Sequence, residues 1–142
     1  MTRTITILLL LLSCLSVVAQ KIKLADPIYL ATTLIDDISI DRMKEACKNY
    51  GLMESEKENE FIVFADEKGN KLRFKVKEVS SGHTPIVEVV SKTPHKEIIQ
   101  ILSNTGFSSL SHSKYVKGDK YAHRITICSF SKGTLTFSKE RR

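Results

Sequence analysis

The stretch Ile40–Gly51, IDRMKEACKNYG, decides the fold, because the stretch His95–Gly106, HKEIIQILSNTG, repeats its pattern. In both, apolar side chains recur at the spacing of one helix face, and both end at a glycine, a common residue after the last turn of a helix. Aligned on these glycines, the stretches match three pairs: Met43 with Ile98, Ala46 with Ile101 and Cys47 with Leu102. The sequence therefore predicts two similar helices, the second with Thr93 as N-cap and Pro94 at its first position.

A β-prone segment precedes each predicted helix, and three strand-like runs follow it. The preceding segments are Pro27–Ile35 and Pro85–Val90. The runs that follow are Leu52–Glu58, Glu60–Asp66 and Lys71–Val79, and then Phe107–Lys117, Lys120–Phe130 and Thr134–Lys139. The predicted fold class is α+β, with two β-α-β-β-β units (27–79 and 85–140) separated at 80–84. They form an antiparallel sheet with two helices packed on one face.

Each unit ends in a hairpin with a Lys-Gly turn, at Lys68-Gly69 and at Lys132-Gly133. A two-residue loop at the first turn pairs Ala65 with Leu72, Val63 with Phe74 and Phe61 with Val76, which gives one apolar face and turns Arg73, Lys75 and Lys77 away from it. The second turn allows two registers. A two-residue loop places Cys128 and Phe130 beside Leu135 and Phe137, whereas a bulged loop places Ile125 and Ile127 there.

The first twenty of the 142 residues are typical of a secretory signal peptide. Arg3 gives a basic start, Ile5–Leu12 is almost wholly apolar, and Val17–Ala19 provides a cleavage site before Gln20. Residues 21–142 then form a single α+β domain in the periplasm or outside the cell. The alternative is an outer-membrane lipoprotein, because Leu11–Cys14 resembles a lipidation motif; a membrane is a partner only if Cys14 carries that lipid.

Two cysteines, Cys47 and Cys128, remain after cleavage before Gln20. In an exported protein they can form a disulfide between helix and sheet, and the alternative is that both thiols fill core positions. The spacing of these cysteines matches no metal site, and we expect neither a metal nor a cofactor.

A hairpin turning at Gly118-Asp119 would pair Lys114 with His123 and bring His112 near them. Two imidazoles and a lysine resemble the acid, base and cation of secreted ribonucleases, which gives the alternative of a phosphodiester-cleaving enzyme. No GxSxG, HExxH, P-loop or GxGxxG motif occurs, so we expect no enzyme. A row of alternating acids is predicted to share one face of a strand: Glu54, Glu56, Glu58 and Glu60.

The formal net charge is +6, and most of the excess lies in the second half of the chain. The candidate binding residues are basic and sit on predicted strands: Arg73, Lys75, Lys77, Lys114, Lys117, Lys120 and Arg124. An acidic protein surface suits these residues and the compartment, whereas nucleic acid does not fit export. The expected function is an exported binding protein that occludes a partner protein, as an immunity factor or enzyme inhibitor does. A lipid-anchored structural component of the envelope is a further alternative.

Two helix-plus-sheet units in a small exported chain resemble, in general plan, the β-lactamase-inhibitor protein family. The resemblance is architectural only, and a shared architecture does not by itself give a function. No functional residue is transferred, because no inhibitor loop matches this sequence. The end of the signal segment, Val17–Lys21, is similar to export signals of Bacteroidetes, which implies a small secreted protein of that type.

Overall fold

The structure, a computed structural model, describes residues 26–79, 82–118 and 124–141. The helices are α2 (Pro27–Leu34), α3 (Ile40–Asn49) and α4 (His95–Asn104). The strands are β1 (Met53–Glu54), β2 (Ile62–Ala65), β3 (Lys71–Val79), β4 (Gly82–Val90), β5 (Ser108–Ser111), β6 (Lys114–Gly118), β7 (Arg124–Ser131) and β8 (Thr134–Arg141). Within these ranges no helix has both the length and the apolar character needed to cross a bilayer. The predicted signal peptide and Cys14 lie outside the described residues.

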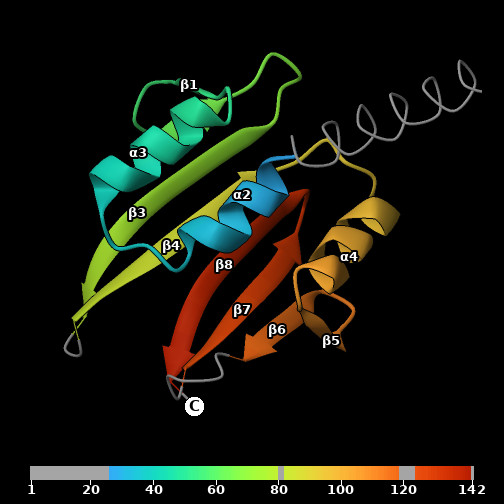
Figure 1. Cartoon of the computed structure of the whole chain (residues 1–142). Helices are drawn as coiled ribbons and strands as arrows, with labels where there is room; N and C mark the ends of the chain where they lie inside the picture. Colours follow the sequence, from blue (N-terminus) through green and yellow to red (C-terminus); the bar gives the residue numbers. More distant parts are fainter. Residues whose placement is uncertain (1–25, 80–81, 119–123, 142) are drawn as a thin grey trace, which may run out of the picture.

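The eight strands form one antiparallel sheet in the order β1-β2-β3-β4-β8-β7-β6-β5, which confirms the α+β class. A helix followed by a four-stranded meander occurs twice, as α3 with β1–β4 and as α4 with β5–β8, and the last strands of the two meanders, β4 and β8, pair at the centre (Figure 1). The predicted boundary between the two copies is therefore displaced. Strand β4 completes the first unit instead of opening the second, because its nine-residue ladder with β3 continues that meander.

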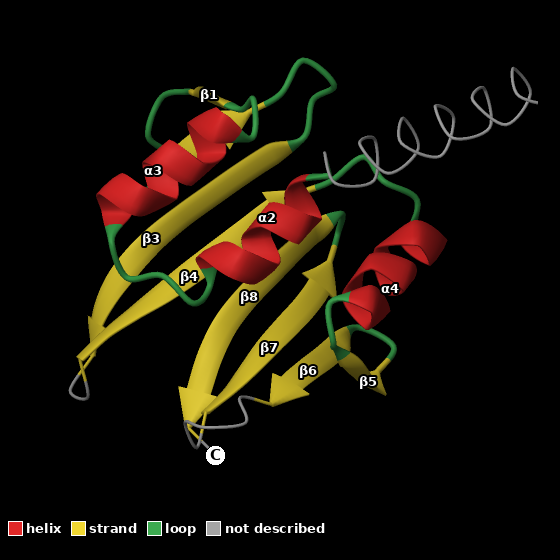
Figure 2. Cartoon of the chain, viewed as in Figure 1, coloured by secondary structure: helices red, strands yellow, loops and turns green. Residues whose placement is uncertain are grey.

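The predicted first strand, Pro27–Ile35, is wrong: this segment is helix α2. The side chain of Asp26 accepts a hydrogen bond from the amide of Ile28, and Pro27 occupies the first turn, which together start a helix. Almost every side chain of α2 is buried, so the sequence shows no polar face and hence no helical period. Helix α2 lies over the centre of the sheet, between α3 and α4 (Figure 2).

Helices α3 and α4 lie where the sequence predicts two helices, and they end in the same way. The amide of Gly51 donates to the carbonyl of Lys48, and the amide of Leu52 donates to the carbonyl of Cys47, at 3.0 Å each. The equivalent amides of Gly106 and Phe107 donate to Ser103 and Leu102, at 3.1 and 2.9 Å. Both glycines have positive φ, +85° and +90°, and Leu52 and Phe107 are buried. Each helix thus ends in a Schellman motif with its hydrophobic contact.

Helix α4 starts one position later than predicted. Its N-cap is Pro94 and its first residue is His95. Thr93 does not cap it, because the hydroxyl of Thr93 donates to the carboxylate of Asp26 at 2.6 Å.

The first hairpin differs from its predicted register by one residue. Phe64 pairs with Leu72, and Ala65 pairs with Lys71. The carboxylate of Asp66 accepts hydrogen bonds from the amides of Lys68 and Asn70, and Gly69 takes φ +84°, so the loop holds three residues instead of two. The second hairpin takes the two-residue loop, with Cys128 opposite Phe137 and Phe130 opposite Leu135.

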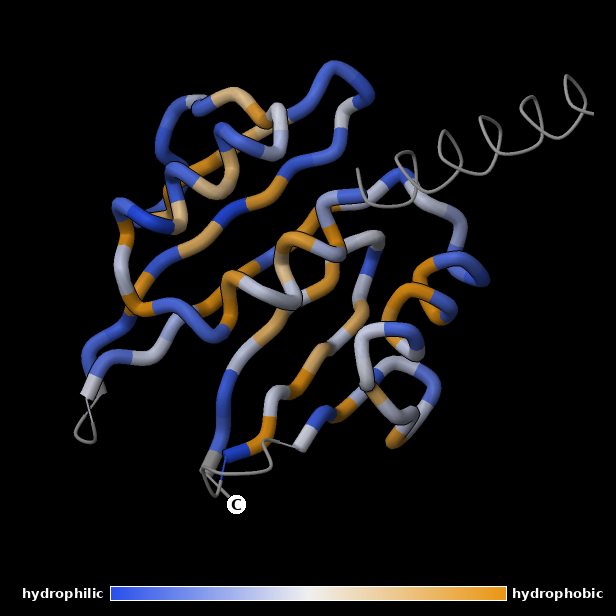
Figure 3. Tube along the Cα trace, viewed as in Figure 1, coloured by the Kyte–Doolittle hydropathy of each residue, from blue (hydrophilic) through white to orange (hydrophobic). Residues whose placement is uncertain are grey.

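All three described helices lie on the same face of the sheet (Figures 1 and 2). Hydropathy alternates along β3, as Figure 3 shows, because Leu72 and Phe74 are buried toward the helices while the side chains between them point away. The buried aromatic residues Phe64, Phe74 and Phe137 lie in the core between the sheet and the helix layer.

Candidate functional site

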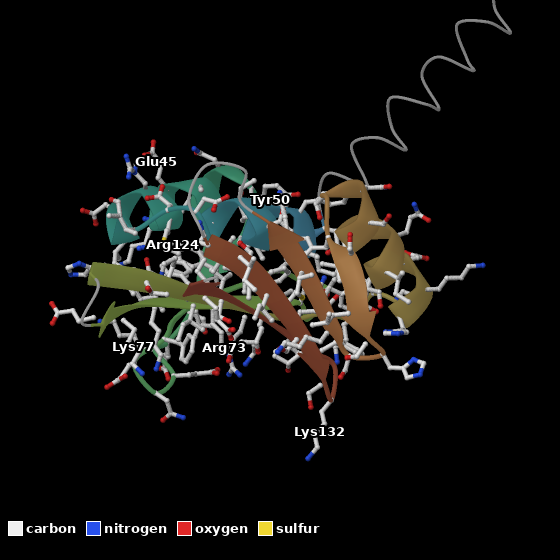
Figure 4. All side chains as sticks on the ribbon, turned by 90° about the horizontal axis from the view of Figure 1, so that it is seen from below. Glu45, Tyr50, Arg73, Lys77, Arg124 and Lys132 are labelled. Atoms are coloured by element: carbon white, nitrogen blue, oxygen red, sulfur yellow. The ribbon has the colours of Figure 1, made fainter. Side chains whose placement is uncertain are left out.

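The face of the sheet opposite the described helices carries a broad area of mainly aliphatic and hydroxyl side chains, which we call the open face. It is built from the outward positions of β4, β8, β7 and β6. One cross-strand row runs Ile86, Ser138, Ile127, Val116, and the next runs Glu88, Thr136, Ser129, Lys114. Most of these side chains are half-buried or exposed, because none of the described helices covers this side of the sheet. In Figure 4, Arg73 and Lys77 project from this side and Glu45 from the helix side.

A turn at Ser55–Phe61, which we call the strap, connects β1 to β2 and presents carboxylates to β3. The amide of Glu58 donates to the carbonyl of Phe61 at 3.1 Å, and the amide of Phe61 donates back to Glu58 at 2.8 Å. Between them, Asn59 and Glu60 take φ +45° and +71°. Both values are costly for residues with a Cβ, more so for glutamate than for asparagine.

The strap is held against β3 by ion pairs. Glu58 contacts the side-chain nitrogens of Lys71 at 3.0 Å and Arg73 at 3.2 Å, and Glu60 contacts Lys75 at 3.4 Å. The hydrogen bond and charge of Lys71, with a smaller contribution from Arg73, lower the pKa of Glu58. Arg73 also pairs with Glu88 on β4.

The ring of Phe61 lies beneath two of the same cations. The guanidinium carbon of Arg73 is 5.5 Å from its centre, and the ammonium of Lys75 is 4.7 Å from it. Both distances allow cation–π attraction. The positive charges of Arg73 and Lys75 are therefore each contacted by a carboxylate of the strap and by the ring of Phe61.

The predicted row of acids is not a row in the structure. Strand β1 ends at Glu54, whose carboxylate contacts Lys44 of α3 at 2.9 Å. Glu58 and Glu60 instead reach β3. The row fails because strand β1 ends at Glu54 and residues 55–57 do not continue it, and because Asn59 and Glu60 form a turn. The sequence alone showed acids here and cations on β3, but nothing in it indicated which would meet.

The predicted basic binding residues divide between the two faces of the sheet. Arg73, Lys75 and Lys77 lie on the outward side of β3, and Lys114 lies on the open face. Lys117 and Arg124 belong to the helix side, where the ammonium of Lys117 lies 5.9 Å from the centre of the Phe107 ring. Lys120 is outside the described residues.

The predicted pairing of Lys114 with His123 is wrong. Strand β6 pairs with β7 so that Lys114 is opposite Ser129 and Tyr115 is opposite Cys128. This register buries Tyr115 and Cys128 together, which a two-residue turn at Gly118-Asp119 would prevent. His112 lies in the exposed turn between β5 and β6, and His123 lies outside the described residues.

Cys47 and Cys128 are buried free thiols, so the structure does not contain the possible disulfide. Helix α3 lies on the β1–β3 side of the sheet, and Cys128 is on β7, three strands beyond β3. That is roughly 14 Å at ordinary strand spacing, well beyond the reach of a disulfide. Burial raises the pKa of both thiols to about 12, which makes them poor nucleophiles.

A polar crevice of about 470 Å³ lies between the N-terminal end of α2, helix α4 and the turn at 66–70. Several of its polar groups bond to one another: Asp26 accepts from Thr93, and the amide side chain of Asn70 donates to Asp66 and accepts from the backbone of Lys92. These bonds tie α2 and the β4–α4 connection to the hairpin. The crevice is therefore a structural junction.

The described residues offer an exposed sheet face next to a set of ion pairs. They include no group of three histidine, cysteine, aspartate or glutamate side chains placed to hold a metal ion. Arg73 and Lys75, next to the open face, are engaged in ion pairs with Glu58, Glu88 and Glu60. Comparison with protein-family models gives no match, and comparisons with characterised proteins and with solved structures give no significant match either.

Proposed function

We propose that this chain is an exported protein that binds and occludes a partner protein through the open face, in the manner of an immunity factor or an enzyme inhibitor. The observation that carries the proposal is the open face itself. The three described helices all lie over one side of the eight-stranded sheet, and its other side carries short hydroxyl side chains around aliphatic ones.

The composition of the open face suits a protein partner. Ile86 and Val116 offer apolar area that a partner can bury, and Thr136, Ser138 and Ser129 offer hydrogen-bond donors and acceptors with little side-chain entropy to lose. Export is supported by the pattern of residues 1–20, and it provides the compartment for occluding an enzyme or toxin outside the cytoplasm.

The test is capture by the full chain, expressed with a C-terminal affinity tag in the cells that produce it. In the variant Ser138→Arg a long cation stands in the middle of the open face. The matched control, Ser103→Arg, places the same group on the exposed surface of α4. We expect wild type and control to retain one protein in stoichiometric amount, identified by mass spectrometry, and Ser138→Arg to lose it.

Titration of that purified partner against the three chains should reproduce the order seen in the capture. The absence of any stoichiometric protein, or equal retention by Ser138→Arg, would contradict the proposal.

A further inference from the structure

The strap occupies cations that a partner would otherwise meet. On β3, Arg73, Lys75 and Lys77 are alternate residues with their side chains on the same side of the sheet. Glu58 and Glu60 of the strap form ion pairs with the first two of these cations, and Glu88 of β4 also pairs with Arg73. Lys77 is exposed, and no carboxylate in the described part of the chain forms an ion pair with it. In this row of three cations, Arg73 and Lys75 are therefore paired with carboxylates, whereas Lys77 is left free by the described residues to meet a partner.

The contacts that hold the strap are weak individually. The side chain of Glu60 is 84% exposed, and that of Glu58 is 39% exposed. Ion pairs in such positions are screened by water and salt. The turn that presents them is also strained, because Glu60 has a positive φ. Separating the strap from β3 breaks two exposed ion pairs, Lys71–Glu58 and Lys75–Glu60, and the half-buried pair Arg73–Glu58.

The geometry of the row suits an extended acidic chain. Side chains two residues apart on a strand are separated by roughly 6.6 Å, and carboxylates on alternate residues of an extended peptide have the same spacing. The strap is a turn and not an extended chain, yet it also presents two carboxylates, Glu58 and Glu60, and the aromatic ring of Phe61 to the row. It shows which chemistry the row accepts.

We propose that an acidic segment of the partner protein docks along β3 on Arg73, Lys75 and Lys77, and that the strap is an internal competitor for the same cations. The partner segment contacts Lys77 first and then displaces Glu60 and Glu58. This proposal rests on the proposed function, because it supplies the chemistry of the partner that meets the neighbouring open face. Removing the two strap carboxylates should therefore strengthen the binding of an acidic peptide.

The probe is a short fluorescein-labelled peptide in which glutamates alternate with threonines and a phenylalanine follows. A second peptide carries glutamines in place of the glutamates. The test protein is the variant Glu58→Gln with Glu60→Gln. Its control, Glu45→Gln with Glu97→Gln, changes the net charge equally but on exposed helix positions, and Figure 4 shows Glu45 on the far side from Arg73.

Fluorescence anisotropy at low ionic strength should show that the strap variant binds the acidic peptide about threefold to tenfold more tightly than wild type, as expected for losing two exposed ion pairs. The control should bind it like wild type, and the glutamine peptide should bind none of the proteins. Lys77→Gln should weaken the binding of the acidic peptide, and added salt should weaken it in every chain.

Equal affinity of the strap variant and its control, or undiminished binding to Lys77→Gln, would overturn the inference. Circular dichroism checks that each variant is folded, and Lys77→Gln decides alone if the strap variant is not. The two proposals fail separately. A partner captured through the open face, with no effect of the strap carboxylates, removes only the strap proposal, whereas no captured partner removes the proposed function.

Discussion

Replacing Gly51 or Gly106 by alanine tests whether the two halves of the chain end their helices for the same physical reason. Both glycines have positive φ, and a Cβ built at Gly51 meets nothing within 4 Å. A Cβ at Gly106 meets only the flexible end of Lys117, at 3.5 Å. Steric crowding is therefore negligible at both sites, and the backbone conformation alone should set the cost.

Left-handed backbone costs a residue with a Cβ about 1–2 kcal/mol. The reduced freedom of alanine in the unfolded chain offsets about 0.4–1 kcal/mol of this. We expect Gly51→Ala and Gly106→Ala each to lower the free energy of unfolding by about 1 kcal/mol. The double variant should lose about 2 kcal/mol, because α3 and α4 lie at opposite ends of the sheet (Figure 1) and their effects should add.

Urea unfolding followed by circular dichroism measures these values, since the m-value should stay constant while the midpoint falls. Thermal melts should shift by roughly 4 °C per substitution. A neutral Gly51→Ala variant beside a Gly106→Ala variant that loses more than about 3 kcal/mol would refute the reasoning, because a backbone cost must be alike at both positions.

Two further outcomes follow from burial and capping. Cys47 and Cys128 should not react with a thiol reagent at pH 8 until the chain is unfolded in urea. Rapid labelling of the native chain would contradict this expectation. The free energy of unfolding should also fall as the pH rises from 9 toward 12. The reason is that the thiols of the unfolded chain ionise near their ordinary pKa of 9.0, whereas those of the folded chain stay protonated to about 12. Asp26→Ala removes the acceptor of the Ile28 amide and of the Thr93 hydroxyl, and should cost about 1–2 kcal/mol in urea unfolding. Asp26→Asn should recover most of the lost stability. An unchanged urea midpoint for Asp26→Ala would contradict the stabilising role of the Asp26 cap.

The elements that sequence reasoning predicts well are those whose pattern is local. Helices α3 and α4 each expose one polar face, so the spacing of Met43 and Cys47, and of Ile98 and Leu102, identifies them. Helix α2 is buried on nearly all sides and lacks that pattern. Only Asp26-Pro27 signals its start, and the same Pro27 can equally open a strand.

Hairpin registers were harder to predict, because one residue in a turn moves every side chain along a strand. At the first hairpin the carboxylate of Asp66 lengthens the loop by a residue, and this contact depends on a hydrogen bond to Asn70. Residue type alone could not place the strap either. The acids of the strap and the cations of β3 are visible in the sequence, but their pairing depends on the turn at Asn59.

The two meanders meet only through their last strands, β4 and β8, and this order affects how the sheet can assemble. Every pair of adjacent strands except β4–β8 is also consecutive along the chain. Each meander can therefore form from local hairpins before β4 and β8 pair. Severed between β4 and α4, either fragment would present its final strand as a bare edge with unsatisfied amides and carbonyls. We therefore expect that neither fragment stays monomeric in isolation. Mixing the two fragments should restore the pairing of β4 with β8.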